Sequence, residues 1–340
     1  MRLLLATMLL SATLPAAERM LLVGGYDPDV RSFALDDSGL RPLASSRIGG
    51  NPSWIAIAPD GRMAYVCDES WPGRIVACRI DRTTGTLTPV STASSGGKGP
   101  CHAALHPDGR WLLVANYGDG AVACLPIDAD GGIAEPVSIL AAGAKAHMVL
   151  PIGGGRVLVP CLGTDRVVTL ACDPRTGALA EQSATAVPAG SGPRHICLAA
   201  DGRQAWITAE LASGVIPAVL GCDGSLAIAA TVSCLPPAWQ GRNSVSGLVL
   251  ADAGRTLLVG NRGHDSLARF SIGADGIPVA NGQVQVGATP RHLAISPDGS
   301  WIAVACQGAG RVEILRFEAG GMRHFAAFAA PKPAFAGFVP

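Results

Sequence analysis

Histidine recurs at one place in a repeated segment of this 340-residue chain. The place lies at the start of the first apolar run of the repeat, and four of the seven histidines of the chain occupy it. In chain order it holds Trp54, His102, His147, His195, Gly247 (or Ser246), His292 and Phe335. Imidazole can exchange a proton near neutral pH and can bind metal ions. The recurrence therefore marks this position as a candidate for chemistry.

Other ionisable side chains accompany the histidines. Arg194 and Arg291 each come directly before one of them, and Lys98 lies a few residues upstream of a third. More polar residues follow the second apolar run of the repeat, namely Glu69, Tyr117, Glu210, Asn261, Arg262 and Gln307. Only 15% of all residues are charged. This gathering at one end of the repeat therefore predicts a functional site.

Such a set of side chains could hydrolyse an ester or a lactone. Glu210 or His147 could take a proton from water, while Arg194 and Arg262 could stabilise an oxyanion, because a guanidinium keeps its charge and donates in a fork. A metal site is an alternative, but zinc and calcium sites usually add carboxylates, and four histidines spread around a ring need not meet at one ion. We predict no metal and no other cofactor. The other alternative is structural, with these groups holding strand ends and water.

The repeat itself predicts the elements that position these residues. Segments such as PSWIAIAPDGRMAYV, PRHICLAADGRQAWI and PRHLAISPDGSWIAV return with a period of about 43 to 51 residues. Each contains two alternating apolar runs joined by a turn of the Asp-Gly type, which is a hairpin signal. A third and a weaker fourth run follow. Four antiparallel strands per period of this length are typical of a β-propeller blade.

The two ends of the repeat array complement each other. Residues 18–48 supply only the later strands of a unit, and residues 333–340 supply a single first strand. If the C-terminal strand joins the N-terminal blade, the ring closes and leaves no exposed edge strands. We therefore predict an all-β fold, a seven-bladed β-propeller with four-stranded blades, formed by residues 18–340 as one domain. An open sandwich of the same strands is the alternative.

The N-terminal segment and the composition bear on location. In residues 1–17 one Arg precedes an apolar run that ends in small residues, the pattern of a secretory signal. We expect a periplasmic or secreted monomer with no further membrane segment. The alternative is a cytoplasmic protein whose first strand begins in this run. A formal net charge of zero argues against nucleic acid as a partner. The ten cysteines lie mostly in apolar runs, which leaves room for one or two disulfides.

The strings that carry these residues resemble the seven-bladed propeller lactonases, the family of bacterial 6-phosphogluconolactonase and fungal carboxymuconate cyclase. The resemblance extends over residues 51–317, and its most specific strings are NRGHDS and LGTDRV. It implies that the chemistry takes place at the mouth of the central channel of the propeller, where the first strand of each blade begins. The family residues there, one His, two Arg and one Glu, match His147, Arg194, Arg262 and Glu210.

The resemblance implies a carboxylic ester hydrolase that opens a small-molecule sugar lactone as 6-phosphogluconolactonase does, here by metal-independent attack of water. No G-x-S-x-G elbow supports a covalent serine mechanism. The residues predicted to bind the substrate are His102, His195, Asn261, His264, Arg291, His292, Glu69 and Lys98. Two alternatives remain open: a lactonising cycloisomerase of the muconate type, and a non-catalytic exported propeller with YVTN-like repeats that serves as a binding module.

Overall fold

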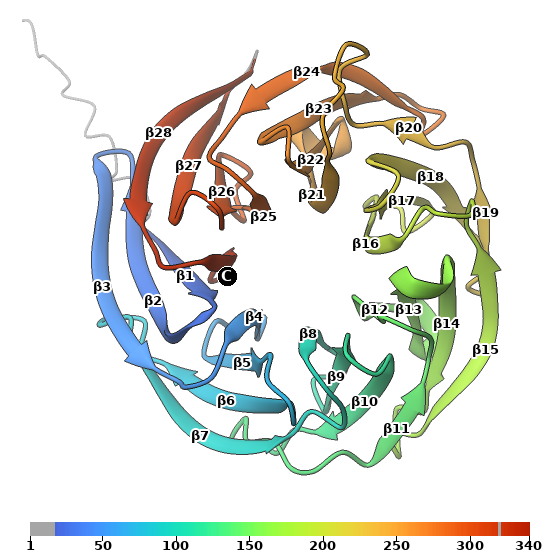
Figure 1. The fold of residues 1–340 in the computed structure, drawn as a ribbon. Coiled ribbons are helices and arrows are strands. Elements are labelled where there is room, and N and C mark those ends of the chain that lie inside the picture. The colour runs from blue at the N-terminus through green and yellow to red at the C-terminus, as the bar shows by residue number, and fades with distance from the viewer. Residues whose placement is uncertain (1–17, 319–320) are drawn as a thin grey trace, which may run out of the picture.

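The computed structural model describes residues 18–318 and 321–340, which form seven antiparallel sheets around a central axis (Figure 1). Six sheets have four strands, and one has five. The predicted all-β propeller with seven blades is therefore confirmed. Within the described residues, the helical segments are three 3-10 turns, η1 (Gly153–Gly155), η2 (Leu162–Thr164) and η3 (Asp252–Gly254). The predicted signal segment, residues 1–17, lies outside the described residues.

The strands of each blade run in order from the innermost, at the central axis, to the outermost. Blade 1 contains β29 (Pro333–Phe338), β1 (Arg19–Gly25), β2 (Asp27–Asp36) and β3 (Gly39–Arg47). Blade 2 contains β4 (Pro52–Ile57), β5 (Met63–Asp68), β6 (Arg74–Ile80) and β7 (Leu87–Ser94). Blade 3 contains β8 (Pro100–Leu105), β9 (Trp111–Asn116), β10 (Ala121–Pro126) and β11 (Ser138–Ala141). Blade 4 contains β12 (Leu150–Ile152), β13 (Arg156–Cys161), β14 (Arg166–Cys172) and β15 (Leu179–Ala186).

The remaining three blades follow the same order. Blade 5 contains β16 (Pro193–Leu198), β17 (Gln204–Ala209), β18 (Gly214–Leu220), β19 (Leu226–Ile228) and β20 (Val232–Ser233), the last two both pairing with β18. Blade 6 contains β21 (Ser244–Ala251), β22 (Thr256–Arg262), β23 (Ser266–Ile272) and β24 (Pro278–Gln285). Blade 7 contains β25 (Pro290–Ile295), β26 (Trp301–Cys306), β27 (Arg311–Glu318) and β28 (Gly321–Ala329).

The ring is closed by the C-terminal strand, as predicted. Strand β29 pairs antiparallel with β1, with Leu21 opposite Phe338 and Gly24 opposite Phe335. All six residues of β29 are buried. Because β29 is the innermost strand of its blade, the C-terminus lies near the centre of the ring (Figure 1). The closure joins the two ends of the chain in one sheet and removes the free edge that each would otherwise present.

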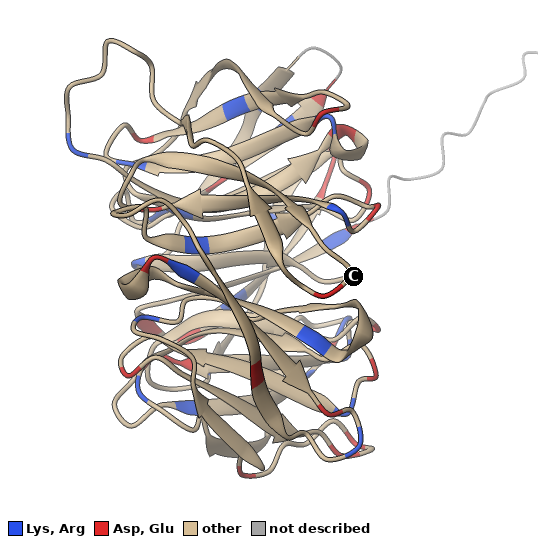
Figure 2. Ribbon diagram, turned by 90° about the vertical axis from the view of Figure 1, so that its right-hand side faces the viewer, with Lys and Arg blue, Asp and Glu red and all other residues tan. Residues whose placement is uncertain are grey.

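The core lies between the faces of neighbouring blades. Second strands such as β5 and β26 are buried at every residue, so they form continuous apolar runs rather than alternating ones. Lys, Arg, Asp and Glu lie mainly toward the strand ends and in the loops (Figure 2). All ten cysteines are free, and most are small side chains of this core. The disulfides left open by the sequence are not formed.

An extra residue near the start of the innermost strand recurs in every blade. In blade 2, Pro52 pairs with Asp68 and Trp54 pairs with Cys67, so the innermost strand advances by two residues while its partner advances by one. The other six blades show the same one-residue shift. Such a bulge re-aims side chains and often occurs beside active sites. It lies at the mouth, the face of the ring where the innermost strands begin and the second strands end.

Candidate active site

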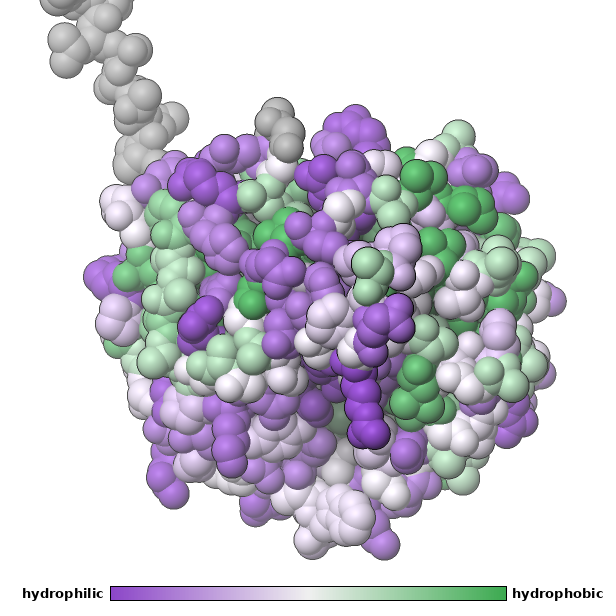
Figure 3. Space-filling view, turned by 45° about the horizontal axis from the view of Figure 1, so that its top comes forward, coloured by the Kyte–Doolittle hydropathy of each residue, from purple (hydrophilic) through white to green (hydrophobic). Residues whose placement is uncertain are grey.

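The mouth contains a polar cavity of about 160 Å³. Its lining residues come from six blades, blades 2 to 7, at the ends of their inner two strands, and they are Glu69, Cys101, Tyr117, His147, Glu210, Arg262 and Arg291. Beneath it lies a smaller cavity of about 10 Å³, which is near the space of one water molecule. That cavity is lined by Ser53, Trp54, Glu69, Cys101, His147, Arg194, His195, Arg291, His292 and Ala334. The space-filling view shows a hollow among hydrophilic side chains (Figure 3).

The bulges explain how consecutive residues reach the same cavity. Successive side chains of a regular strand point to opposite faces, so Arg194 and His195 would ordinarily diverge. Both instead line the deeper cavity, as do Arg291 and His292. Because the bulge inserts one unpaired residue at this point, it breaks the alternation where β16 and β25 begin.

A glutamate held by two arginines forms the centre of the site. Glu210 Oε2 lies 3.0 Å from Arg194 Nε and 2.8 Å from Arg262 Nη2. Arg262 Nη2 also donates to the carbonyl oxygen of Val245 at 2.9 Å. The side chain of Arg194 is only 4% exposed. Within the described residues, Arg194 Nη1 and Arg262 Nε have no hydrogen-bond partner. Buried donors without partners are costly, so they point to a ligand or water at the cavity.

A second cluster lies across the cavity and contains a residue that the sequence reasoning missed. Arg291 Nη2 donates to the hydroxyl of Tyr26 at 2.7 Å, and this hydroxyl donates to Glu69 Oε2 at 2.9 Å. Tyr26 directly follows β1, the second strand of its blade, just as Glu69 follows β5 and Glu210 follows β17. The repeat register therefore contained the signal that could have identified it.

The charges at the mouth do not cancel. Arg194, Arg262 and Arg291 contribute three positive charges, and Glu69 and Glu210 contribute two negative charges when ionised. Burial and the neighbouring Arg262 lower the pKa of Arg194. A guanidinium nevertheless stays charged at physiological pH. The cluster therefore has one excess positive charge and favours an anion or a developing oxyanion.

His147 is the histidine that reaches both cavities. Its Nδ1 lies 3.9 Å from Cys101 Sγ, and its ring centre lies 5.5 Å from that of Tyr117. Burial, Arg194 and Arg291 together lower the pKa of His147 well below the usual value. The ring is therefore neutral at physiological pH. Burial and Glu69 raise the pKa of Cys101, so its thiol stays protonated. The sequence reasoning missed Cys101, although it precedes His102 as the arginines precede their histidines.

The other three histidines of the recurrent position close the channel below the site. The ring of Trp54 lies 4.0 Å from His102, 5.7 Å from His195 and 5.0 Å from His292, centre to centre. Phe335 stacks on His292 at 4.8 Å. Burial lowers the pKa of all three histidines, that of His292 to about 4. These neutral rings form an aromatic plug with Trp54 and Phe335, and Trp54, His195 and His292 of this plug also line the deeper cavity.

Four of the predicted substrate-binding residues do not line either cavity. Asn261 is fully buried, and its amide donates to the carbonyl oxygen of Cys234 at 2.8 Å. His264 packs against Trp239 with ring centres 4.7 Å apart. Lys98 is exposed at the rim of the mouth. His102 lies in the plug rather than at a cavity. Their roles as substrate contacts stay predictions.

Metal ligands are not grouped at the mouth. Across residues 18–318 and 321–340, no three His, Cys, Asp or Glu side chains are placed to hold a metal ion. The carboxylate of Glu210 is taken up by arginines and that of Glu69 by Tyr26. The donor set therefore suits an anion better than a cation.

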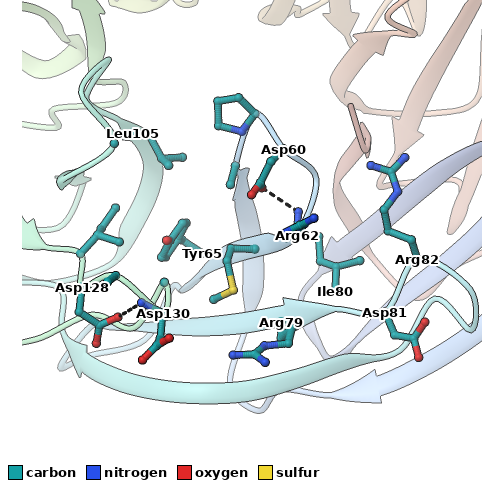
Figure 4. A pocket seen from close by; sticks show the side chains of 17 residues that line it. Asp60, Arg62, Tyr65, Arg79, Ile80, Asp81, Arg82, Leu105, Asp128 and Asp130 are labelled. Atoms are coloured by element: carbon teal, nitrogen blue, oxygen red, sulfur yellow. Dashed lines mark hydrogen bonds between the residues drawn. The ribbon is translucent and has the colours of Figure 1, made fainter.

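Larger hollows lie on the opposite face of the ring, between pairs of blades. The one between blades 2 and 3 has a volume of about 840 Å³ and is lined by Asp60, Tyr65 and Asp128 among others (Figure 4). Similar hollows of about 840 and 640 Å³ lie between blades 6 and 7 and between blades 4 and 5. Their lining residues differ. None of the three contains a residue that lines the cavities at the mouth, so the mouth remains the candidate site.

Comparison with known proteins decides the family. The family model described as "Lactonase, 7-bladed beta-propeller" matches residues 20–336. The chain belongs to this family. Within the residues that the structure describes, no helix has the length and apolar character needed to cross a membrane.

Relatives of this lactonase-family chain have named activities. The 6-phosphogluconolactonase of Bacillus subtilis (strain 168) is 27% identical over 264 residues, which are 73% of this chain and 75% of that protein. The 6-phosphogluconolactonase of Pectobacterium carotovorum is 28% identical and matches 81% of this chain and 83% of its own length. Among solved structures, the periplasmic gluconolactonase of Pseudomonas aeruginosa superposes with a TM-score of 0.88 at 29% identity, covering 95% of this chain and 99% of that one.

Proposed function

We propose that this protein is a lactonase that hydrolyses a sugar lactone in the cavity at the mouth. The observation that carries the proposal is Glu210 held between Arg194 and Arg262, whose unpartnered N–H groups lie at the two cavities. The family and the named activities of the relatives support the same reaction. The excess positive charge suits a substrate whose carbonyl oxygen becomes negative during the reaction.

In the proposed reaction, the oxygen of a water molecule attacks the carbonyl carbon of the lactone. A tetrahedral oxyanion forms, the ring C–O bond breaks, and the departing ring oxygen takes up the proton that the water has released. The open hydroxy acid retains the added oxygen. Arg194 and Arg262 stabilise the oxyanion through charge-assisted hydrogen bonds. Each such donor is worth about 100-fold to 1,000-fold in rate in comparable sites. A δ-lactone is already reactive, so we propose that no metal ion is required.

Proton transfer is assigned to Glu210, with His147 as the residue that orients the water. The positive surroundings that lower the pKa of His147 make its imidazolium form costly. A neutral ring can still accept or donate a hydrogen bond. Protonation of His147 would put a charge on a buried neutral ring, whereas protonation of Glu210 removes a charge, and burial disfavours charged forms. Glu210 is therefore the better acceptor of the two candidates.

The test measures lactone hydrolysis by the purified protein on D-glucono-δ-lactone and its 6-phosphate, corrected for spontaneous opening. We expect Arg194→Ala and Glu210→Gln each to lower kcat/KM about 100-fold or more. Arg62→Ala is the matched control, because Arg62 lies at a hollow on the opposite face. Circular dichroism confirms that each variant is folded. Full activity in both site variants overturns the assignment, and activity lost with a chelator overturns metal independence.

A second reaction would use the same groups. The excess positive charge would also bind an unsaturated diacid, and the proton-transfer residues would then serve lactone formation rather than hydrolysis. Incubation of the purified protein with cis,cis-muconate tests this alternative. Consumption of muconate without hydrolysis of either sugar lactone favours the cycloisomerase. Inactivity on all three compounds by a folded protein favours the binding module.

We also propose that the protein is exported and works as a monomer. The pattern of residues 1–17 supports export, as does the relative named a periplasmic gluconolactonase. Fractionation of the source cells, with N-terminal sequencing of the recovered protein, should place a chain that begins near Glu18 outside the cytoplasm. A cytoplasmic chain that retains Met1 or Arg2 contradicts export. Light scattering of the purified protein measures its oligomeric state.

A further inference from the structure

Trp71 has the largest exposed fraction, 71%, among the large hydrophobic side chains of the described residues. It lies in the loop between β5 and β6, on the face of the mouth. Exposing an indole to water forgoes the free energy that its burial would supply. Trp combines a large flat apolar ring with a polar N–H group, and it is enriched at binding interfaces. The position of Trp71 is therefore a reason to look for a ligand that covers it.

The loop that carries Trp71 is firmly held by its neighbours. Gly99 N donates to the carbonyl oxygen of Ser70 at 3.0 Å, and the carbonyl oxygen of Gly99 accepts from Tyr117 N at 2.9 Å. A Cβ on Gly99 would lie 3.1 Å from the indole Nε1, and one on Gly118 would lie 3.1 Å from its Cζ2. One side of the indole therefore rests on two glycine backbones. The ring is an ordered platform even though most of it faces solvent.

This platform borders the cavity at the mouth. Glu69, two residues before Trp71, lines the cavity. Tyr117 also lines it and directly precedes Gly118, against which the indole rests. A ligand that extends out of the cavity between these two residues would pass over the indole. Lys98, exposed in the loop beneath it, supplies an ammonium group with three donors.

We propose that Trp71 forms an outer subsite that binds a second sugar ring, so that the enzyme accepts lactones of disaccharide acids as well as single-ring lactones. This inference rests on the proposed lactonase function. The apolar C–H face of a pyranose fits a flat indole, and its hydroxyls can accept from Lys98. Leu211, 58% exposed, follows Glu210 on the opposite side of the cavity and offers no comparable flat surface.

Two measurements test the subsite. The first compares kcat/KM for cellobiono-δ-lactone and D-glucono-δ-lactone in the wild type, Trp71→Ala, Trp71→Phe and Leu211→Ala. The second is calorimetric binding of the ring-opened acids, cellobionate and gluconate, which the enzyme does not hydrolyse. Leu211→Ala is the matched control, an exposed apolar residue on the other side of the mouth.

We expect Trp71→Ala to lower the cellobionolactone-to-gluconolactone ratio of kcat/KM about tenfold, which corresponds to about 1.4 kcal/mol. In Trp71→Ala, the affinity for cellobionate relative to that for gluconate should fall by a similar factor. Trp71→Phe, which keeps a flat ring, should keep both ratios near their wild-type values. Leu211→Ala should change neither ratio. Unchanged ratios in Trp71→Ala overturn the subsite while leaving hydrolysis of gluconolactone intact. If the wild type opens neither lactone, the proposed function fails, and the binding ratio alone then decides the subsite.

Discussion

At the scale of single residues, the mouth holds charged side chains that are buried, although burial disfavours charge. Burying a guanidinium and a carboxylate together usually contributes little to stability, because desolvation offsets the attraction between them. Arg194 is nevertheless almost fully buried beside Glu210, with donor groups left unpartnered. A site that must stabilise a developing negative charge needs such prearranged donors. The arrangement therefore supports the proposed role of Arg194 in stabilising an oxyanion.

Tyr26 offers a prediction at this scale. Its hydroxyl joins Arg291 to Glu69, two charged groups that come from different blades. We expect Tyr26→Phe to lower the free energy of unfolding by about 1 kcal/mol and to lower kcat/KM on the lactone, because both charged groups lose a hydrogen-bond partner. Urea unfolding and the hydrolysis assay measure the two effects. Wild-type values in both would show that the hydroxyl positions neither group.

At the scale of elements, the innermost strands both close the ring and aim the site. Each contributes a bulge at the mouth, so that neighbouring residues such as Arg291 and His292 turn toward the same cavity. Strand β29 is the innermost strand of blade 1 and contributes the same bulge, although it comes from the other end of the chain. The closing strand therefore holds together the two blades beside it.

Removal of residues 333–340 tests the importance of this closure. The truncated chain loses a strand in which every residue is buried and leaves β1 without its inner partner. We expect loss of cooperative thermal unfolding and a shift to aggregates in size-exclusion chromatography, because an open ring exposes strand edges and apolar surface. Removal of Pro340 alone, an exposed residue, is the control. An unchanged melting temperature in the longer truncation contradicts the role assigned to β29.

At the scale of the whole molecule, four buried neutral histidines make stability depend on pH. Burial lowers the pKa of His102, His147, His195 and His292 below the value of about 6.5 that applies in the unfolded chain. Below pH 6.5 the unfolded chain therefore binds more protons than the folded protein. The stability that these rings contribute is complete above pH 6.5 and is lost as the pH falls toward their folded values.

We accordingly expect the free energy of unfolding to fall between pH 6.5 and pH 4.5, by up to about 1.4 kcal/mol per pH unit for each histidine. For His292 the window reaches down to its folded pKa of about 4. His292→Phe keeps an aromatic ring against Phe335 and removes one titrating group, so its slope should be shallower. Urea unfolding at several pH values measures both slopes. Identical slopes for the wild type and His292→Phe would contradict a contribution of His292 to the pH dependence of stability.

The sequence by itself determined the architecture and the residue types at the mouth. Paired apolar runs, Asp-Gly turns and a period of about 43 to 51 residues identify a blade, because strand pairing within a hairpin depends on local pattern. The incomplete units at the two ends then specify the closing strand. The same register places His147, Glu210 and Arg262 at one end of the repeat, and the structure brings them to one cavity.

Only the tertiary structure decided how these side chains divide their roles. It places three of the four recurrent histidines in an aromatic plug and brings only His147 to both cavities. It joins Glu210 to arginines from two blades. It also brings Tyr26 into the site and moves His264 away from it. The physical reason is that a one-residue bulge reverses the direction of a side chain, and contacts across the ring depend on the packing of all seven blades.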